Sequence, residues 1–393
     1  MWIKHFPGAL IAILMVNGFA YSYFAITFPS VGRALDFSDT NTGLILGISA
    51  LVITLVSPFW GFICETRGRR KVLFWGILAT TLFNILSAVV IHLRLELALS
   101  AQVAFMALLS VRMLNSLFTG GIKPGAQAQI ADLTTVGTRA RGMGLMGAAF
   151  GLGTIAGGFC AAISGIDFLI PAFIVISALL GLVCIYAHYQ LPETLYSAGH
   201  KPQPIPTPIP IGRIWLFLLI TWFALTMFSQ LQHIATLNFE DRYGFDSHQA
   251  IQRSGVSMML ATIMMIVVQG LVIPVLQLKP RQLMILGCLA GILAMIILAL
   301  AFNAWAFTLG LTFFGLGLGL MLPGNLAAMS LASPDSVQGK VAGLNGIGQG
   351  LGLASGPIFG ALLHQFSSVA PFVGSAMVLG LVITMLMFLT DKG

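Results

Sequence analysis

Five polar residues recur at helical spacing in an otherwise apolar stretch, and two of them are cations. Arg112, Ser116, Thr119, Lys123 and Gln127 are three or four positions apart, so in a helix they lie on one face. The two cations would stand about 16 Å apart along the axis. A cation within a membrane span costs about 2.5–3.5 kcal/mol. We therefore expect this face to line a protein or water-filled interior and to bind a solute.

Each cation also has a simpler interpretation. Arg112 could be a structural arginine that binds carbonyls at helix ends. Lys123 lies roughly two turns from the end of the predicted helix, so its side chain could extend to the membrane surface.

The carboxylates favour the solute-binding interpretation. All 12 Asp and Glu residues fall in predicted loops or at helix ends, and none lies in the middle of a span. Two interior cations without an interior carboxylate make a positive cavity, which suits an anionic solute better than a cationic one.

The same distribution leaves few candidates for a proton carrier. Asp132 ends the helix that carries Arg112, and Asp39 lies at the opposite side of the membrane. His233 is a third candidate, because histidine is the side chain that could gain or lose a proton without a large pKa shift. We favour Asp132 acting with Arg112. Because about 30 Å of helix would separate these two residues, their coupling would have to pass through a conformational change.

Further polar side chains lie within apolar runs and are candidate substrate contacts, although a single polar residue in a span more often makes a hydrogen bond between helices. Two pairs share a helix face because their members are four positions apart. The candidates are Asn17, Tyr21, Gln230, His233, Asn345 and Gln349, beside Arg112, Thr119, Lys123 and Gln127.

Composition places these helices in a bilayer. Of the 393 residues, 58% are hydrophobic and 8% are charged, whereas soluble domains carry about 25% charged residues. The net charge is +7, but most of the basic residues lie in short loops between apolar runs, so the charge does not indicate nucleic acid. Spans of about 20 residues are predicted near 8–28, 42–63, 72–92, 100–131, 142–164, 168–190, 214–236, 250–273, 283–302, 304–331, 341–362 and 371–390.

An internal repeat divides the chain into two halves. Lys123-Pro-Gly125 recurs as Leu322-Pro-Gly324, and a glycine series continues at the same offset: Gly147, Gly151, Gly153 and Gly157 recur as Gly346, Gly350, Gly352 and Gly356. We predict an all-α fold of twelve spans in two pseudo-symmetric six-helix bundles, residues 1–190 and 214–393, joined by a proline-rich cytoplasmic linker, residues 191–213.

The basic loop residues predict the orientation. With the N-terminus inside, most of them, including Arg67, Arg69 and Arg70, lie on the cytoplasmic side, and few, such as Arg33 and Arg94, lie opposite. We expect a multi-pass monomer in the plasma membrane, the inner membrane in a Gram-negative bacterium, with both termini cytoplasmic.

The loop after the second span resembles the signature of the major facilitator superfamily. That signature is Gly61, an acid at Glu65, then Gly68, Arg69 and Arg70, with Glu65 in place of the usual Asp. The resemblance implies a conformational latch that closes the cytoplasmic side, whereas the simpler interpretation is a topology anchor.

Two further segments strengthen the resemblance. Arg112 matches a motif that the family connects with proton coupling, although Ser116 replaces its glycine. The stretch from Gly147 to Gly158 resembles the glycine-rich motif of the drug/proton antiporter branch, although it would also serve plain helix packing.

Together these features predict a secondary active transporter that exports a small organic anion, such as a metabolite, siderophore or drug, in exchange for protons. The alternative is uptake of such an anion by proton symport or facilitated diffusion. The sequence has no GxxxxGK[ST] motif, no HExxH or GxSxG and no cysteine spacing for a metal. We therefore expect no catalytic residues, no metal and no cofactor.

Overall fold

The computed structural model describes residues 8–134, 136–192, 210–276, 278–334 and 337–388. The chain divides into two compact units, Met1–Lys201 and Pro202–Gly393. Of the predicted linker, residues 191–213, the part from 193 to 209 lies outside the described residues.

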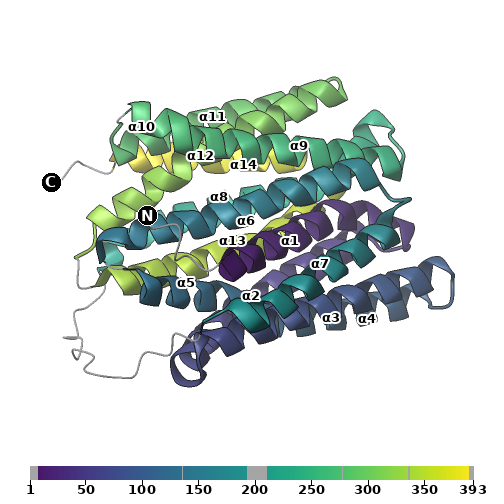
Figure 1. Ribbon diagram of the computed structural model, residues 1–393. Coiled ribbons are helices and arrows are strands. Elements are labelled where there is room, and N and C mark those ends of the chain that lie inside the picture. The colour runs from purple at the N-terminus through teal and green to yellow at the C-terminus, as the bar shows by residue number, and fades with distance from the viewer. Residues whose placement is uncertain (1–7, 135, 193–209, 277, 335–336, 389–393) are drawn as a thin grey trace. The chain divides into compact units, whose positions relative to one another are not determined.

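Unit 1 consists of helices in its described part (Figure 1). They are α1 (Gly8–Ala34), α2 (Asp39–Arg67), α3 (Arg69–Leu95), α4 (Ala101–Thr119), α5 (Ile122–Leu133), α6 (Val136–Ser164) and α7 (Leu169–Gln190).

Unit 2 is built in the same way. Its elements are α8 (Ile211–Tyr243), α9 (Ser247–Val267), the π-helical turn η2 (Val268–Val272), α10 (Ile273–Leu276), α11 (Pro280–Leu300), α12 (Ala304–Leu331), α13 (Gln338–Phe366) and α14 (Ala370–Phe388).

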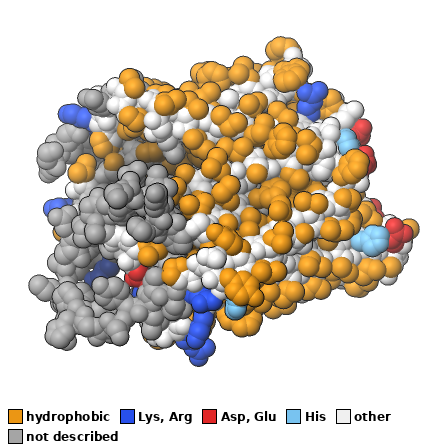
Figure 2. Space-filling model, in the orientation of Figure 1, with side chains coloured by type: hydrophobic (Ala, Val, Ile, Leu, Met, Phe, Trp, Pro, Cys, Tyr) orange, Lys and Arg blue, Asp and Glu red, His pale blue; other side chains and the backbone are white. Residues whose placement is uncertain are grey.

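The described residues contain 12 helical segments long and apolar enough to cross a membrane. Helices α4 and α5 together form one of these segments, and α9, η2 and α10 together form another. On the face drawn in Figure 2, hydrophobic side chains cover the middle stretches of the helices, and the charged side chains in view gather near helix ends. The predicted all-α class and the twelve spans are confirmed.

Short polar side chains begin four of these helices. Ser38, Ser100, Asp246 and Asn303 each accept a hydrogen bond from a backbone N–H in the first turn of α2, α4, α9 and α12. Such N-caps satisfy amide groups that the helix cannot bond internally.

The predicted span at 100–131 differs from a single straight helix. It is interrupted at Gly120 and Gly121, where the amide of Gly121 bonds the carbonyl of Phe118 in a tighter turn. Pro124 has no N–H to continue the helical ladder. A Cβ on Gly121 would lie 2.8 Å from Val72 of α3. The glycines thus let this turn approach the neighbouring helices, and Arg112 and Lys123 lie on opposite sides of it.

The glycine series of unit 1 holds α6 against α1. A Cβ built on Gly153 would lie 2.0 Å from the carbonyl oxygen of Met15, and one on Gly157 would lie 2.7 Å from that of Phe19. Both distances are shorter than real side-chain contacts, so only glycine permits this approach.

Unit 2 repeats the same packing between α13 and α8. A Cβ on Gly352 would lie 2.6 Å from the carbonyl oxygen of Trp222, and one on Gly356 would lie 2.5 Å from that of Thr226. The repeat read from the sequence therefore corresponds to equivalent helix pairs, α1 with α6 and α8 with α13.

Candidate functional site

Arg112 lies in α4 beside α1 and has an aromatic neighbour. Its guanidinium carbon stands 3.9 Å from the centroid of the Phe24 ring. Tyr21, one turn earlier on α1, is near enough for an electrostatic interaction with Arg112. The buried Nε of Arg112 has no hydrogen-bond partner among the described residues. No carboxylate among the described residues pairs with Arg112, so its Nε–H remains a donor for another group.

Lys123 and Gln127 occupy the exposed face of α5. The opposite face packs on α2 and α3, since a Cβ on Gly125 would lie 3.2 Å from Leu73 and 3.6 Å from Cys64. The structure thus brings Lys123 and Gln127 together, one turn apart, on the accessible side of the helix.

The other members of the predicted face are less accessible. Ser116 is buried, and the half-buried Thr119 donates its hydroxyl proton to the carbonyl of Asn115 at 3.0 Å. The accessible polar side chains of this predicted face, Lys123 and Gln127, therefore follow the turn at Gly120–Gly121.

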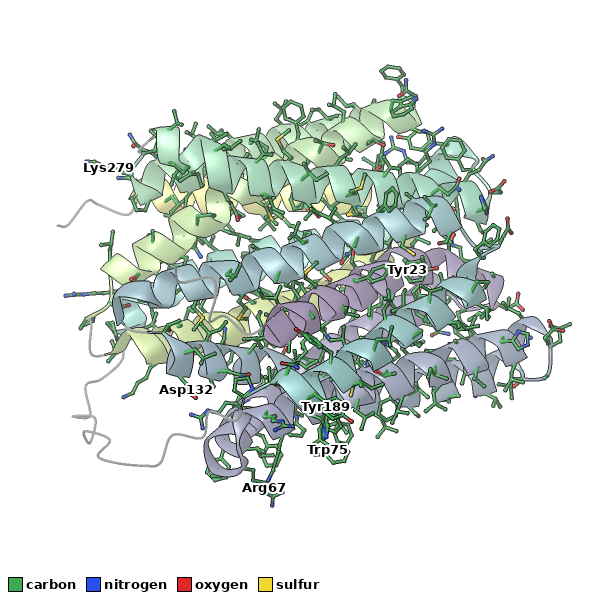
Figure 3. All side chains as sticks on the ribbon, viewed as in Figure 1. Tyr23, Arg67, Trp75, Asp132, Tyr189 and Lys279 are labelled. Carbon is green, nitrogen blue, oxygen red and sulfur yellow. The ribbon has the colours of Figure 1, made fainter. Side chains whose placement is uncertain are left out.

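Two candidates on α1 lie beside α6. Asn17 and Tyr21 are both half-buried, and the ring of Tyr21 lies 6.2 Å from the ring of Phe150. Two residues further on, the Tyr23 hydroxyl lies 3.2 Å from Ser164 Oγ, and Figure 3 labels Tyr23 on α1. Tyr21 therefore has aromatic and cationic neighbours from two helices.

Gln230 and His233 lie deep inside unit 2. Gln230 of α8 donates from Nε2 to the carbonyl of Pro371 at 3.0 Å and to Ser375 Oγ at 3.2 Å, and both partners belong to α14. His233 is 1% exposed. The contacts of Gln230 are those of a residue that joins two helices.

Asn345 belongs to a buried polar cluster. Its side-chain oxygen accepts a 2.6 Å hydrogen bond from Thr221 of α8, and the same hydroxyl accepts one from Asn325 of α12 at 2.8 Å. Gln349, one turn after Asn345, is half-buried. Sequence reasoning missed Asn325, although an Asn directly after the repeated Leu-Pro-Gly of an apolar span was a usable signal.

The predicted latch lies at the join between α2 and α3. Gly68 has φ 102°, a conformation that side chains rarely adopt, so the second glycine of the signature is required for the turn. A Cβ on Gly61 would meet no atom within 4 Å. The side chain of Glu65 lies outside the described residues.

The two arginines of the signature tie this join to other helices of unit 1. Arg69 donates to the carbonyl of Cys64 at 3.0 Å and forms an ion pair with Asp132 of α5, Nε to Oδ2, at 2.9 Å. Arg70 donates to the carbonyl of His188 in α7. Figure 3 shows Asp132 at the end of α5. The cation beside Asp132 is thus Arg69, while Arg112 lies on the far side of the turn.

The other predicted proton-carrier candidate is also paired. Asp39 accepts two hydrogen bonds from Arg33, at 2.9 and 2.8 Å, which join the end of α1 to the start of α2. In unit 2, Asp241 Oδ2 lies 2.8 Å from Nε2 of His364, whose side chain is 4% exposed. Sequence reasoning missed this titratable pair because α8 and α13 bring together residues that are remote in the chain.

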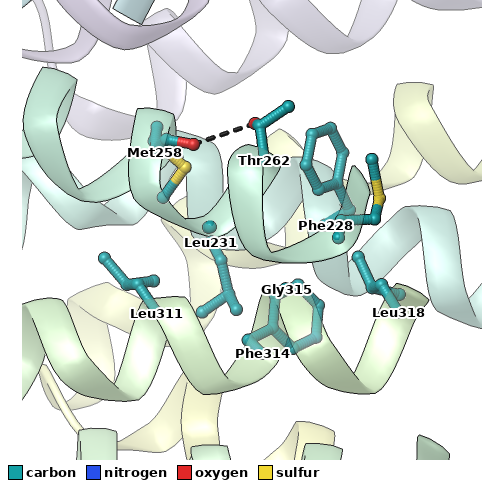
Figure 4. A pocket seen from close by; sticks show the side chains of 10 residues that line it. Phe228, Leu231, Met258, Thr262, Leu311, Phe314, Gly315 and Leu318 are labelled. Carbon is teal, nitrogen blue, oxygen red and sulfur yellow. Dashed lines mark hydrogen bonds between the residues drawn. The ribbon is translucent and has the colours of Figure 1, made fainter. Parts of the chain in front are cut away.

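A small apolar pocket lies between α8, α9 and α12 (Figure 4). Phe228, Met258, Leu311 and Phe314 are among the side chains that line it. It offers only about 10 Å³, which is too small for an organic solute. Within unit 2 alone, this pocket therefore provides no solute-sized site.

Twelve apolar spans within the described ranges, in two units that repeat the same glycine-packed helix pairs, are the architecture of a multi-pass membrane protein. The sequence model of the Major Facilitator Superfamily matches residues 10–346 and 276–393, and the chain belongs to that family. It is therefore a transporter and not an enzyme.

Known relatives agree with this assignment. The chain is 25% identical over 371 residues to the class C tetracycline resistance protein of Escherichia coli, and the matched region covers 89% of each protein. It is 23% identical over 373 residues to multidrug resistance protein 2 of Bacillus subtilis, covering 91% of this chain and 88% of the relative. The predicted resemblance to the drug/proton antiporter branch is confirmed.

Solved structures show the same fold. The human organic anion transporter MFSD10 superposes with a TM-score of 0.69 at 17% identity, covering 96% of this chain and 98% of that protein.

Proposed function

We propose that this transporter exports a small organic anion from the cell in exchange for protons. The resistance proteins among its relatives, named for tetracycline and for multiple drugs, support the export direction. The surroundings of Arg112 support an anionic solute, because no Asp or Glu side chain among the described residues pairs with this interior cation.

The surroundings of Arg112 carry this proposal. A guanidinium that faces an aromatic ring at 3.9 Å, with a buried Nε that bonds no described atom, retains donors for a carboxylate or similar group. Tyr21 and Asn17, on the adjacent face of α1, would bind the uncharged part of the solute. This arrangement makes unit 1 the main anion-binding half.

Lys123 and Gln127 extend the same path along α5. Because both are exposed on one face, a solute that leaves Arg112 would next meet the Lys123 ammonium group. In unit 2 we assign the corresponding contacts to Asn345 and Gln349, with Gln230 and His233 positioning α8.

The join between α2 and α3 acts as the latch of the cytoplasmic side. Arg69 holds the end of α5 through Asp132, so a change at the signature is transmitted to the span that carries Lys123. Glu65 and Arg70 complete the latch, and it stabilises the outward-facing state.

Proton exchange would act on the same contact. Protonation of Asp132 removes its negative charge and weakens its attraction to Arg69, so a proton and an arginine compete for one carboxylate. Asp39, held by Arg33, is the second candidate, and the Asp241–His364 pair is a third that the structure adds.

We also propose that the protein is a monomer in the plasma membrane with both termini in the cytoplasm.

The direction of transport is tested with inside-out and right-side-out membrane vesicles and a panel of radiolabelled organic acids. Export predicts accumulation in the inside-out vesicles when their lumen is made acidic. Accumulation only in right-side-out vesicles would establish uptake instead.

A further inference from the structure

Unit 2 has a basic, aromatic pocket outside the residues assigned to transport. It lies where α8 ends, α9 begins and α11 passes into α12, and its volume is about 470 Å³. Two arginines and four aromatic residues line it: Arg242, Arg253, Tyr243, Phe245, Phe302 and Trp305.

Arg242 fixes one wall of this pocket. Its guanidinium donates to the carbonyls of Leu298 at 2.8 Å and of Ala299 and Ala301 at 3.1 Å, at the C-terminal end of α11. The Tyr243 hydroxyl donates to the same Ala301 carbonyl at 3.1 Å. Since helix ends of this kind carry partial negative charge, Arg242 is held by the fold itself.

Arg253 is held differently. Its guanidinium carbon lies 5.0 Å from the ring centroid of Trp305 and 5.7 Å from that of Phe245. No carboxylate, hydroxyl or carbonyl in the described ranges accepts a hydrogen bond from it. Asp246, the acid that precedes it at the start of α9, accepts the amide of Gln249 as the N-cap instead. Arg253 therefore brings positive charge and unused donors to the pocket.

The mouth of the pocket is apolar. Phe302 is 86% exposed and Trp305 is 66% exposed, and Leu309, one helical turn after Trp305, is exposed as well. Phe302 lies just before the span Ala304–Leu331 and Trp305 lies in its first turn, which is the depth at which aromatic side chains meet lipid headgroups. A ligand here needs an anionic group for the arginine and an apolar part for the exposed side chains.

We propose that this pocket binds the phosphate of a membrane phospholipid, with Arg253 donating to the phosphate oxygens and the acyl chains lying along Phe302, Trp305 and Leu309. A planar guanidinium matches two phosphate oxygens at once, and its stacking on Trp305 keeps it oriented. Inorganic phosphate has the same charged group but nothing for the apolar mouth. A lipid uses both parts of the site.

Native mass spectrometry of the purified protein in maltoside detergent tests the proposal, with dioctanoyl-phosphatidylglycerol as the probe. The wild type should bind this lipid, and Arg253→Gln should bind it about tenfold more weakly or worse. Arg213→Gln is the matched control, because it removes one positive charge from an exposed position at the other end of α8 and should leave binding unchanged. Dioctanoylglycerol, which lacks the phosphate, should not bind at this site.

Two further measurements make the outcome decisive. Arg253→Lys keeps the charge and should retain part of the affinity, and a thermal melt of each variant shows whether it is folded. Equal lipid binding by wild type and a folded Arg253→Gln would overturn the proposal. Displacement of the lipid by low concentrations of inorganic phosphate would also overturn it and would identify a soluble phosphate site.

Discussion

Replacing Gly153 by alanine tests whether the glycine series fixes the distance between α1 and α6. The new Cβ would lie 2.0 Å from the Met15 carbonyl oxygen and 2.8 Å from its carbon, whereas ordinary contacts begin near 3.4 Å. The obstacle is backbone, so a side-chain rotation cannot relieve it and α1 must move. Overpacking of this kind costs about 1–3 kcal/mol.

Gly147→Ala is the control on the same helix, because a Cβ there meets no atom within 4 Å. Each substitution gains up to about 1 kcal/mol of helix propensity, and this gain cancels between the two variants. We expect Gly153→Ala to be less stable than Gly147→Ala by about 1–3 kcal/mol. The assay is thermal unfolding of both purified variants in one detergent at one heating rate. Equal apparent midpoints would refute the close packing of α1 and α6.

Three predictions concern transport. Lys123→Ala should weaken binding of the transported acid by about 1.5–3 kcal/mol in a ligand titration, with Lys123→Arg retaining part of it; normal binding would make Lys123 a surface anchor. Glu65→Gln should slow turnover more than it weakens binding, because it changes a conformational equilibrium and not the site; unchanged transport with unchanged cytoplasmic cysteine labelling would contradict the latch. Asp132→Asn should lose the response of transport to an imposed pH gradient in proteoliposomes; a response equal to that of the wild type would place the proton carrier elsewhere.

Hydropathy and the repeat predicted the fold well because both reflect requirements that are local in sequence. A bilayer demands about 20 apolar residues per span, and the packing of α6 on α1 demands glycine at fixed intervals. The same demand recurs at Gly352 and Gly356 in unit 2. The interruption of the helix at Gly120–Gly121 was harder to predict. The equivalent segment of unit 2, with Leu-Pro-Gly in place of Lys-Pro-Gly, lies in the continuous helix α12. Gly121, which corresponds to Leu320 in the other half, is the local difference.

The partners of the candidate residues were not predictable in the same way. Asp132 meets Arg69, and Thr221 links Asn345 to Asn325, only because separate helices pack together. Residues 63 or more positions apart in sequence give no periodic signal of such contact. The sequence predicted which helices carry the polar groups. Tertiary packing determines which of these groups form hydrogen bonds or ion pairs with one another.

The exchange of an organic anion for protons can be measured most directly in proteoliposomes that enclose a pH-sensitive dye. Adding a transported acid outside should drive the acid inward and protons outward, so the lumen should become more alkaline, and its methyl ester should produce no such change. Protein-free liposomes give the contribution of passive acid permeation, which acidifies the lumen. We expect alkalinisation with the wild type and no alkalinisation with Arg112→Gln. Equal transport of acid and ester, or acid transport without any pH change, would contradict it.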